Sequence, residues 1–163
     1  MRDLIVEERD NIDTVIFMMT EDNLKRVLAH PQVLVGSDSS VRSAEGILAR
    51  GKPHPRGFGT FPRVLGMYVR EEKVLSLETA VRKMTSEAAS KFKLEGRGII
   101  KPGAFADLVM FDPAAVADKS TWSEPHRYPA GIPHVVVNGS AVVTDGKPTG
   151  AWPGRILRRT GAA

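Results

Sequence analysis

The segment Val33-Leu34-Val35-Gly36-Ser37-Asp38 constrains the fold of this chain more than any other stretch. Short continuous apolar runs are typical of strands that are buried on both faces, as in a parallel sheet. The run ends at Gly36, and an acidic side chain follows two positions later. In α/β barrels the chemistry lies at the C-terminal ends of the strands, so Asp38 is a candidate catalytic residue. The alternative is that Asp38 only orders a turn, because Ser-Asp-Ser-Ser also favours turns.

The residues before this segment predict a strand, a helix and a second strand. Thr14–Met19 is another apolar run, and Thr20 is placed to cap the helix that follows it. His30-Pro31 predicts the end of that helix. A crossover of about a dozen residues between two strands implies that the strands are parallel. The first part of the chain is therefore expected to have an α/β fold.

A long irregular stretch, residues 39–61, follows the second strand and is rich in glycine and proline. A loop of this length inside a compact domain is usually functional or disordered. Beyond it we expect one helix that starts at Pro62 and another that is capped by Ser76.

After Gly96 the pattern changes from helix to strand. Ile99-Ile100 and Asp107–Phe111 are expected strands, and residues 114–131 are expected to form a surface loop. The strongest local signal is Asn138-Gly139 between two valine-rich runs, because Asn-Gly is the preferred type I′ hairpin turn.

Asp145-Gly146 indicates a further turn. We therefore divide the chain into an α/β part (residues 1–95), a β part (96–155) and a basic tail (156–163).

Composition excludes several classes of function. The chain has no cysteine, which rules out disulfides, thiol catalysis and thiolate metal sites. Its net charge is +4, but the basic residues are scattered, so no nucleic-acid partner is expected. No apolar run approaches the roughly 20 residues of a membrane span, and the start of the chain lacks the apolar core of a secretion signal. We therefore expect a cytoplasmic protein without a membrane partner.

Several of these stretches resemble one enzyme family. Gly36-Ser37-Asp38, His54-Pro55-Arg56 and the Gly-Thr-Phe-Pro-Arg-Val-Leu run at residues 59–65 resemble the C-terminal part of the N-acyl-D-amino-acid deacylases, or D-aminoacylases. These enzymes are metal-dependent amidohydrolases. The stretches Gly98–Pro113 and Val137-Asn138-Gly139 are similar to the C-terminal β segment of that wider superfamily.

The resemblance implies the C-terminal part of a (β/α)8 TIM barrel, in residues 1–95, with a small β-sandwich segment in residues 96–155. It implies a zinc-dependent hydrolase, with one or two zinc ions in the intact enzyme. The substrate would be a small molecule, an N-acyl-D-amino acid whose linear amide bond is hydrolysed. Asp38 matches the position of the general base, which lies near or on the metal, so Asp38 is both the catalytic and the metal-binding candidate.

Three side chains in or just after the long loop are candidates for substrate binding. A substrate carboxylate is best held by a bidentate guanidinium, which favours Arg56 or Arg63. His54 stands beside Arg56 in the sequence. The alternative for both arginines is that they pin the loop by donating to carbonyl groups, and for His54 that it orders the loop.

The other metal ligands of the family, a His-x-His pair, further histidines and a cysteine, are absent from this sequence. Its four histidines, at positions 30, 54, 126 and 134, do not have ligand spacing, whereas zinc needs three or four ligands. A barrel also needs roughly 200 residues. We therefore expect a C-terminal fragment that is inactive alone.

The alternative is a non-catalytic remnant of the amidohydrolase fold that self-associates. Open strand edges and apolar helix faces favour association. The expected partner is either a second copy of the chain or a missing N-terminal part of the enzyme.

Overall fold

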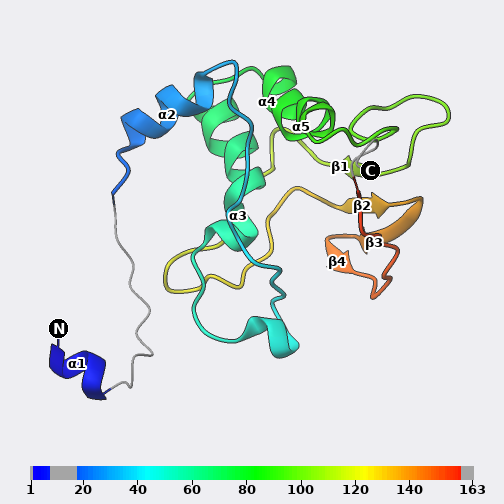
Figure 1. Cartoon of the computed structure of the whole chain (residues 1–163). Helices are drawn as coiled ribbons and strands as arrows, with labels where there is room; N and C mark the ends of the chain where they lie inside the picture. Colours follow the sequence, from blue (N-terminus) through cyan, green and yellow to red (C-terminus); the bar gives the residue numbers. More distant parts are fainter. Residues whose placement is uncertain (1, 8–17, 159–163) are drawn as a thin grey trace.

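The structure is a computed structural model, and it describes residues 2–7 and 18–158. Helices dominate the first part of the chain, and the last part forms a four-stranded sheet (Figure 1). The helical elements are α1 (Arg2–Glu7), α2 (Glu21–Ala29), η1 (Gly46–Ala49), α3 (Arg56–Arg63), η2 (Val64–Glu71), α4 (Leu77–Met84) and α5 (Ser86–Lys91). The strands are β1 (Leu108–Met110), β2 (His134–Val137), β3 (Ser140–Thr144) and β4 (Lys147–Pro148).

Two of the predicted helix caps are confirmed. The Thr20 hydroxyl accepts the backbone N–H of Asn23 at 3.3 Å at the start of α2, and the backbone of His30 turns to an extended conformation at its end. The Ser76 hydroxyl accepts the N–H of Thr79 at 3.2 Å at the start of α4. Each cap satisfies a backbone donor that has no partner inside the helix.

The helix expected to start at Pro62 starts earlier, and that prediction was wrong. Helix α3 begins at Arg56, directly after Pro55, and Pro62 lies inside it. A proline inside a helix removes one backbone donor. The wider π-helical winding of η2 begins two residues further on, and α3 and η2 form one continuous rod.

The hydrophobic core lies among the helices. Its buried members include Val64, Leu65 and Tyr68 of η2, Ala80 of α4 and Val116. Val116 belongs to the stretch expected to be a surface loop, so that expectation was wrong for part of residues 114–131. The loop packs this closely because Gly66 has no side chain: a Cβ there would lie 2.7 Å from the carbonyl oxygen of Val116. Arg70 Nη1 also donates to that oxygen at 2.6 Å.

The sheet has the order β1-β2-β3-β4, and all of its strand pairs are antiparallel. Asn138 and Gly139 have φ angles of 47° and 81° between β2 and β3, the positive values that a type I′ turn requires. The turn predicted at Asp145-Gly146 is also present, between β3 and β4.

Of the two further strands expected in the β part, one is observed. The run Asp107–Phe111 contains β1. Ile99-Ile100 forms no strand, and the prediction there was wrong: Ile100 is 90% exposed, and the Pro-Gly turn follows before the chain can pair.

The predicted pair of parallel strands is not observed. Residues 14–17 of the first run lie outside the described residues, and Met18 and Met19 are exposed and not in a strand. Val33–Val35 also has no strand assignment, because no described strand lies beside it to complete a ladder. The described residues combine helices with a sheet, but the strand–helix–strand unit is absent from them.

Candidate active site

The structure places Asp38 on the surface, three residues after Val35. Its side chain is 89% exposed, and its backbone has a φ of 47°, in the left-handed region that aspartate tolerates better than most residues. Arg56 Nη2 lies 2.9 Å from Asp38 Oδ2. In this chain the carboxylate faces solvent and has a cationic partner on α3.

His54 and Arg56 form one local unit at the start of α3. The Nδ1 atom of His54 accepts the backbone N–H of Arg56 at 3.0 Å, so the ring proton is assigned to Nε2. The His54 ring also packs edge-on against Trp122, with 4.5 Å between the centroids. Burial, and secondarily the charge of Arg56, lowers the pKa of His54, so the ring is neutral at pH 7.

Arg63 lies at the other end of α3 and has different partners. Its Nη1 lies 3.2 Å from Asp118 Oδ2, and its Nη2 lies 3.9 Å from Glu21 Oε1. Glu21 also accepts the Tyr68 hydroxyl at 3.0 Å. The side chains of Arg56 and Arg63 are equally exposed, at 43%, so their partners distinguish them. Arg63 joins α2 and the loop at Asp118 to α3, whereas Arg56 joins α3 to Asp38.

The residues that the structure describes do not fit a zinc site. Among residues 2–7 and 18–158 there is no group of three or more His, Asp or Glu side chains that could hold a metal ion. His30 Nδ1 accepts the N–H of Gln32, and His126 packs edge-on against Phe58. Asp38 therefore has no further metal ligands beside it in the described part of the chain.

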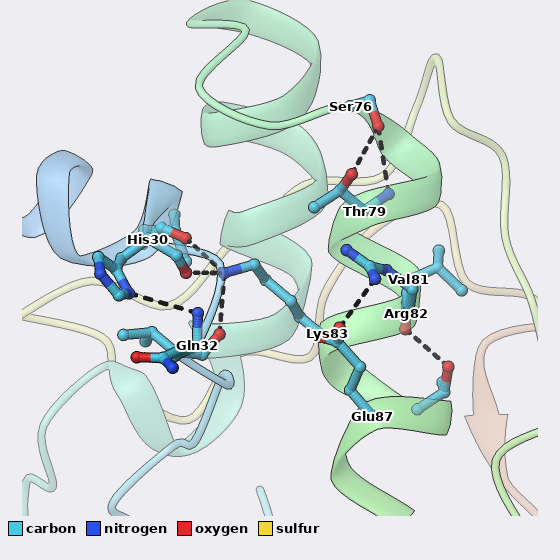
Figure 2. A network of polar contacts seen from close by, with 11 residues as sticks. His30, Gln32, Ser76, Thr79, Val81, Arg82, Lys83 and Glu87 are labelled. Carbon is cyan, nitrogen blue, oxygen red and sulfur yellow. Dashed lines mark hydrogen bonds and ion pairs between the residues drawn. The ribbon is translucent and has the colours of Figure 1, made fainter. Parts of the chain in front are cut away.

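One buried charge was missed by the sequence analysis. Lys83 of α4 is 1% exposed, and its amine is surrounded by backbone carbonyls at the end of α2 (Figure 2). The signal was present in the sequence: Lys83 follows Ala80 by three positions and so lies on the same helix face. Ala80 is 0% exposed, so that face is the buried one.

Comparison with known proteins shows the class of protein to which this fold and site belong. Residues 9–143 match the family model described as the Amidohydrolase family, and the chain belongs to that family. The family resemblance predicted from the sequence is confirmed.

The particular relatives are deacylases. The chain is 46% identical to D-aminoacylase of Alcaligenes xylosoxydans xylosoxydans over 158 residues, which are 97% of this chain and 31% of that protein. It is also 46% identical to N-acyl-D-glutamate deacylase of the same organism, over 89% of this chain and 28% of the relative. The chain thus spans about a third of the length of the curated relatives it matches.

Two solved structures are similar to this chain. A crystal structure of D-aminoacylase superposes with a TM-score of 0.79 and 49% identity, over 88% of this chain and 29% of the other. N-acyl-D-glutamate deacylase from Bordetella bronchiseptica, complexed with zinc and a phosphonate mimic of the tetrahedral intermediate, superposes with a TM-score of 0.69 and 46% identity, over 80% and 27%. A binuclear metal centre is described for D-aminoacylase. In the part of this chain that the structure describes, no helix is long and apolar enough to cross a membrane.

Proposed function

We propose that this chain forms the C-terminal part of a zinc-dependent deacylase that hydrolyses the amide bond of N-acyl-D-amino acids. The observation that carries the proposal is the 46% identity to D-aminoacylase over 97% of the chain. In this proposal residues 1–95 complete a (β/α)8 barrel, residues 96–155 form part of a β-sandwich, and residues 156–163 form a basic tail. The enzyme works in the cytoplasm.

The lack of a described pairing strand beside Val33–Val35 supports the proposal that this chain is part of a larger fold. These residues have the composition of a strand buried on both faces, yet no described strand pairs with them. A barrel strand loses its ladder when its neighbours belong to residues outside the described part. The same reasoning applies to zinc, for which the described residues provide no complete ligand set.

In the assembled enzyme Asp38 is the general base. Its carboxylate takes a proton from the attacking water and returns it to the leaving amine, a role that requires a carboxylate within hydrogen-bond reach of both. Asp38 would be the contact of this chain with the metal. Zinc, held by further ligands from the rest of the enzyme, would polarise the water and the carbonyl.

Arg56 binds the carboxylate of the substrate. The guanidinium lies next to Asp38, at 2.9 Å, so a substrate held there would have its amide close to the base. His54 acts on the same substrate contact by holding the backbone of Arg56. Arg63 is the weaker candidate, because two carboxylates of the chain already surround its guanidinium.

A reconstitution experiment tests this function. The purified chain with added zinc is expected not to hydrolyse N-acetyl-D-amino acids, whereas mixing it with the remaining N-terminal two thirds of D-aminoacylase is expected to give zinc-dependent hydrolysis. Asp38→Asn should then reduce kcat by about 100- to 10,000-fold, the usual contribution of a general base.

Asp145→Asn is the matched control. Asp145 is also exposed, at 86%, and also has a positive φ, of 51°, but it lies in the turn between β3 and β4. Activity of the zinc-loaded chain alone would contradict the proposed division of the site. Equal activity of the two variants in the reconstituted enzyme would remove Asp38 from the mechanism.

The second candidate function is a self-associating remnant of the fold without catalysis. The exposed apolar edge of the sheet favours it, since Leu108, Val109 and Met110 of β1 are 40%, 57% and 60% exposed. Two measurements test this second candidate. A stable monomer in light scattering would contradict self-association, and activity on reconstitution would contradict the absence of catalysis.

A further inference from the structure

The Lys83 amine joins α4 to the turn that leads into the Asp38 segment. Its Nζ donates to the carbonyl oxygens of Leu28 at 3.0 Å, His30 at 2.5 Å and Val33 at 2.8 Å. These three acceptors lie within six consecutive residues, at the end of α2 and the start of the extended segment. Figure 2 shows the lysine side chain crossing from α4 to the backbone around His30.

The chemistry of this contact is specific to an ammonium group. A lysine amine has three N–H donors, and all three have an acceptor here. The end of a helix carries partial negative charge on carbonyls without helical partners, so a cation is favoured at the end of α2. Full burial makes the arrangement demanding, because a buried charge is tolerated only when it is hydrogen-bonded.

The location of the third acceptor connects Lys83 to the site. Val33 is the first residue of the Val33–Asp38 segment, and no strand among the described residues holds this segment in a ladder. Val35 packs partly against the core. The polar contact from Lys83 therefore fixes the starting point of a segment that ends, five residues later, at Asp38.

We propose that Lys83 is a positioning residue for Asp38. It holds the segment by its backbone and so sets where the carboxylate of Asp38 stands relative to Arg56. The effect on turnover rests on the proposed deacylase function, but the effect on the position of the segment does not.

The first measurement reads the position of the segment in the full chain. Because the protein has no cysteine, two introduced cysteines, Ser40→Cys and Glu78→Cys, accept spin labels at defined places after the segment and on α4. Lys83→Met, which keeps an unbranched chain of similar length but removes the charge, is expected to broaden the distance distribution between the labels. The matched control Lys91→Met removes an exposed lysine from α5 and should leave the distribution unchanged.

Lys83→Arg separates charge from shape. The guanidinium is positive but planar, and its longer side chain does not match three carbonyls grouped around one nitrogen. We expect a distribution that stays narrow but shifts in its mean distance. If circular dichroism shows that Lys83→Met does not fold, the distance measurement on Lys83→Arg alone tests the proposal. A distribution identical to that of the unsubstituted chain, in any folded Lys83 variant, overturns the proposal.

The second measurement uses the reconstituted enzyme. Displacing a catalytic group by about 1 Å costs on the order of a hundredfold in rate, so Lys83→Met should reduce kcat by that factor. KM should change little, because Arg56 stands on α3, which Lys83 does not contact through these hydrogen bonds. A rise in KM of about a hundredfold with unchanged kcat overturns the positioning role. A broadened distribution in a chain that never gives activity supports the positioning of the segment and contradicts the deacylase function instead.

Discussion

The β2–β3 hairpin and the Val33–Asp38 segment are both rich in valine, but only the hairpin forms strands. The hairpin contains its own partner, because the two-residue turn at Asn138-Gly139 returns the chain along itself. No described strand pairs with the Val33–Asp38 segment, which is held instead by the Lys83 hydrogen bond to Val33 and by the packing of Val35. The difference shows that a valine run encodes the capacity to pair, while the partner decides whether a strand forms.

The extent of burial also differs between the helical core and the sheet. Val116 packs fully inside the helical half, whereas Val109 on β1 is 57% exposed. The stability of this chain should therefore come mostly from the helical half, and the apolar face of β1 should contribute little in the isolated chain.

The largest change in the free energy of unfolding is expected when a buried and an exposed valine are each replaced by alanine. Val116→Ala should lower the free energy of unfolding by about 2–3 kcal/mol, since it removes two buried methyl groups and leaves a cavity. Val109→Ala should change it by less than about 0.5 kcal/mol, as for most exposed substitutions. Urea unfolding of both variants measures the difference. Similar losses would mean that another surface covers β1 in solution.

A smaller effect is expected at Asp107, which connects the hairpin to the chain before it. Its Oδ1 accepts the backbone N–H of Asn138 at 2.8 Å, and its other oxygen pairs with Arg97. Asp107→Asn should cost about 1–2 kcal/mol at pH 7, because these bonds to a charged group lie partly exposed. A loss of stability in this variant would show that the hairpin, like the Val33–Asp38 segment, is held in part by a residue outside it.

The same substitution should change the response to acid. Burial raises the pKa of the Asp107 carboxyl, but the Asn138 N–H and Arg97 outweigh burial and hold the pKa below its ordinary value. The stabilisation is therefore present above the unfolded pKa and is lost as the pH falls through the folded pKa. The unfolding free energies of the two proteins should converge on acidification, and a constant difference down to low pH would contradict this assignment.

The smallest effect is expected from one added methyl group in each region. Gly139→Ala should cost about 1–2 kcal/mol or less, because the φ of 81° is unfavourable for alanine although no atom blocks the Cβ. Gly36→Ala lacks such a φ and also has open space, so it should be neutral or stabilise by a few tenths of a kcal/mol. Thermal melts of the two variants measure this, and the reverse order would show that the backbone at Gly36 is the more restricted one.

The sequence predicted those parts of the fold that depend on neighbouring residues. The caps at Thr20 and Ser76 and the turn at Asn138-Gly139 each need only residues within three positions. Val33–Val35 was predicted as a strand from composition alone, and Ile99-Ile100 in the same way. Both lack pairing because a ladder requires a second segment that a local pattern does not specify.

The candidate site was predicted to a similar extent. Sequence reasoning selected Asp38, His54 and Arg56 as candidates, and the structure brings them together. It treated Arg63 as equivalent to Arg56, which the structure separates, since Asp118 comes from a loop 55 residues later. Lys83 was missed for a related reason. Its spacing to Ala80 indicates the buried helix face, but its acceptors are backbone carbonyls 50 to 55 residues earlier, which no side-chain pattern specifies.

The contact between Gly66 and the carbonyl of Val116 has a consequence for how this protein can change over generations. Two stretches of chain touch there with only hydrogen on one side, so even the addition of one carbon would force them apart. A mutation at this glycine can be accepted only together with a rearrangement of the loop around Val116. Substitutions at Gly66 and in the loop around Val116 should therefore occur together during evolution, although neither residue is a candidate for catalysis or substrate binding.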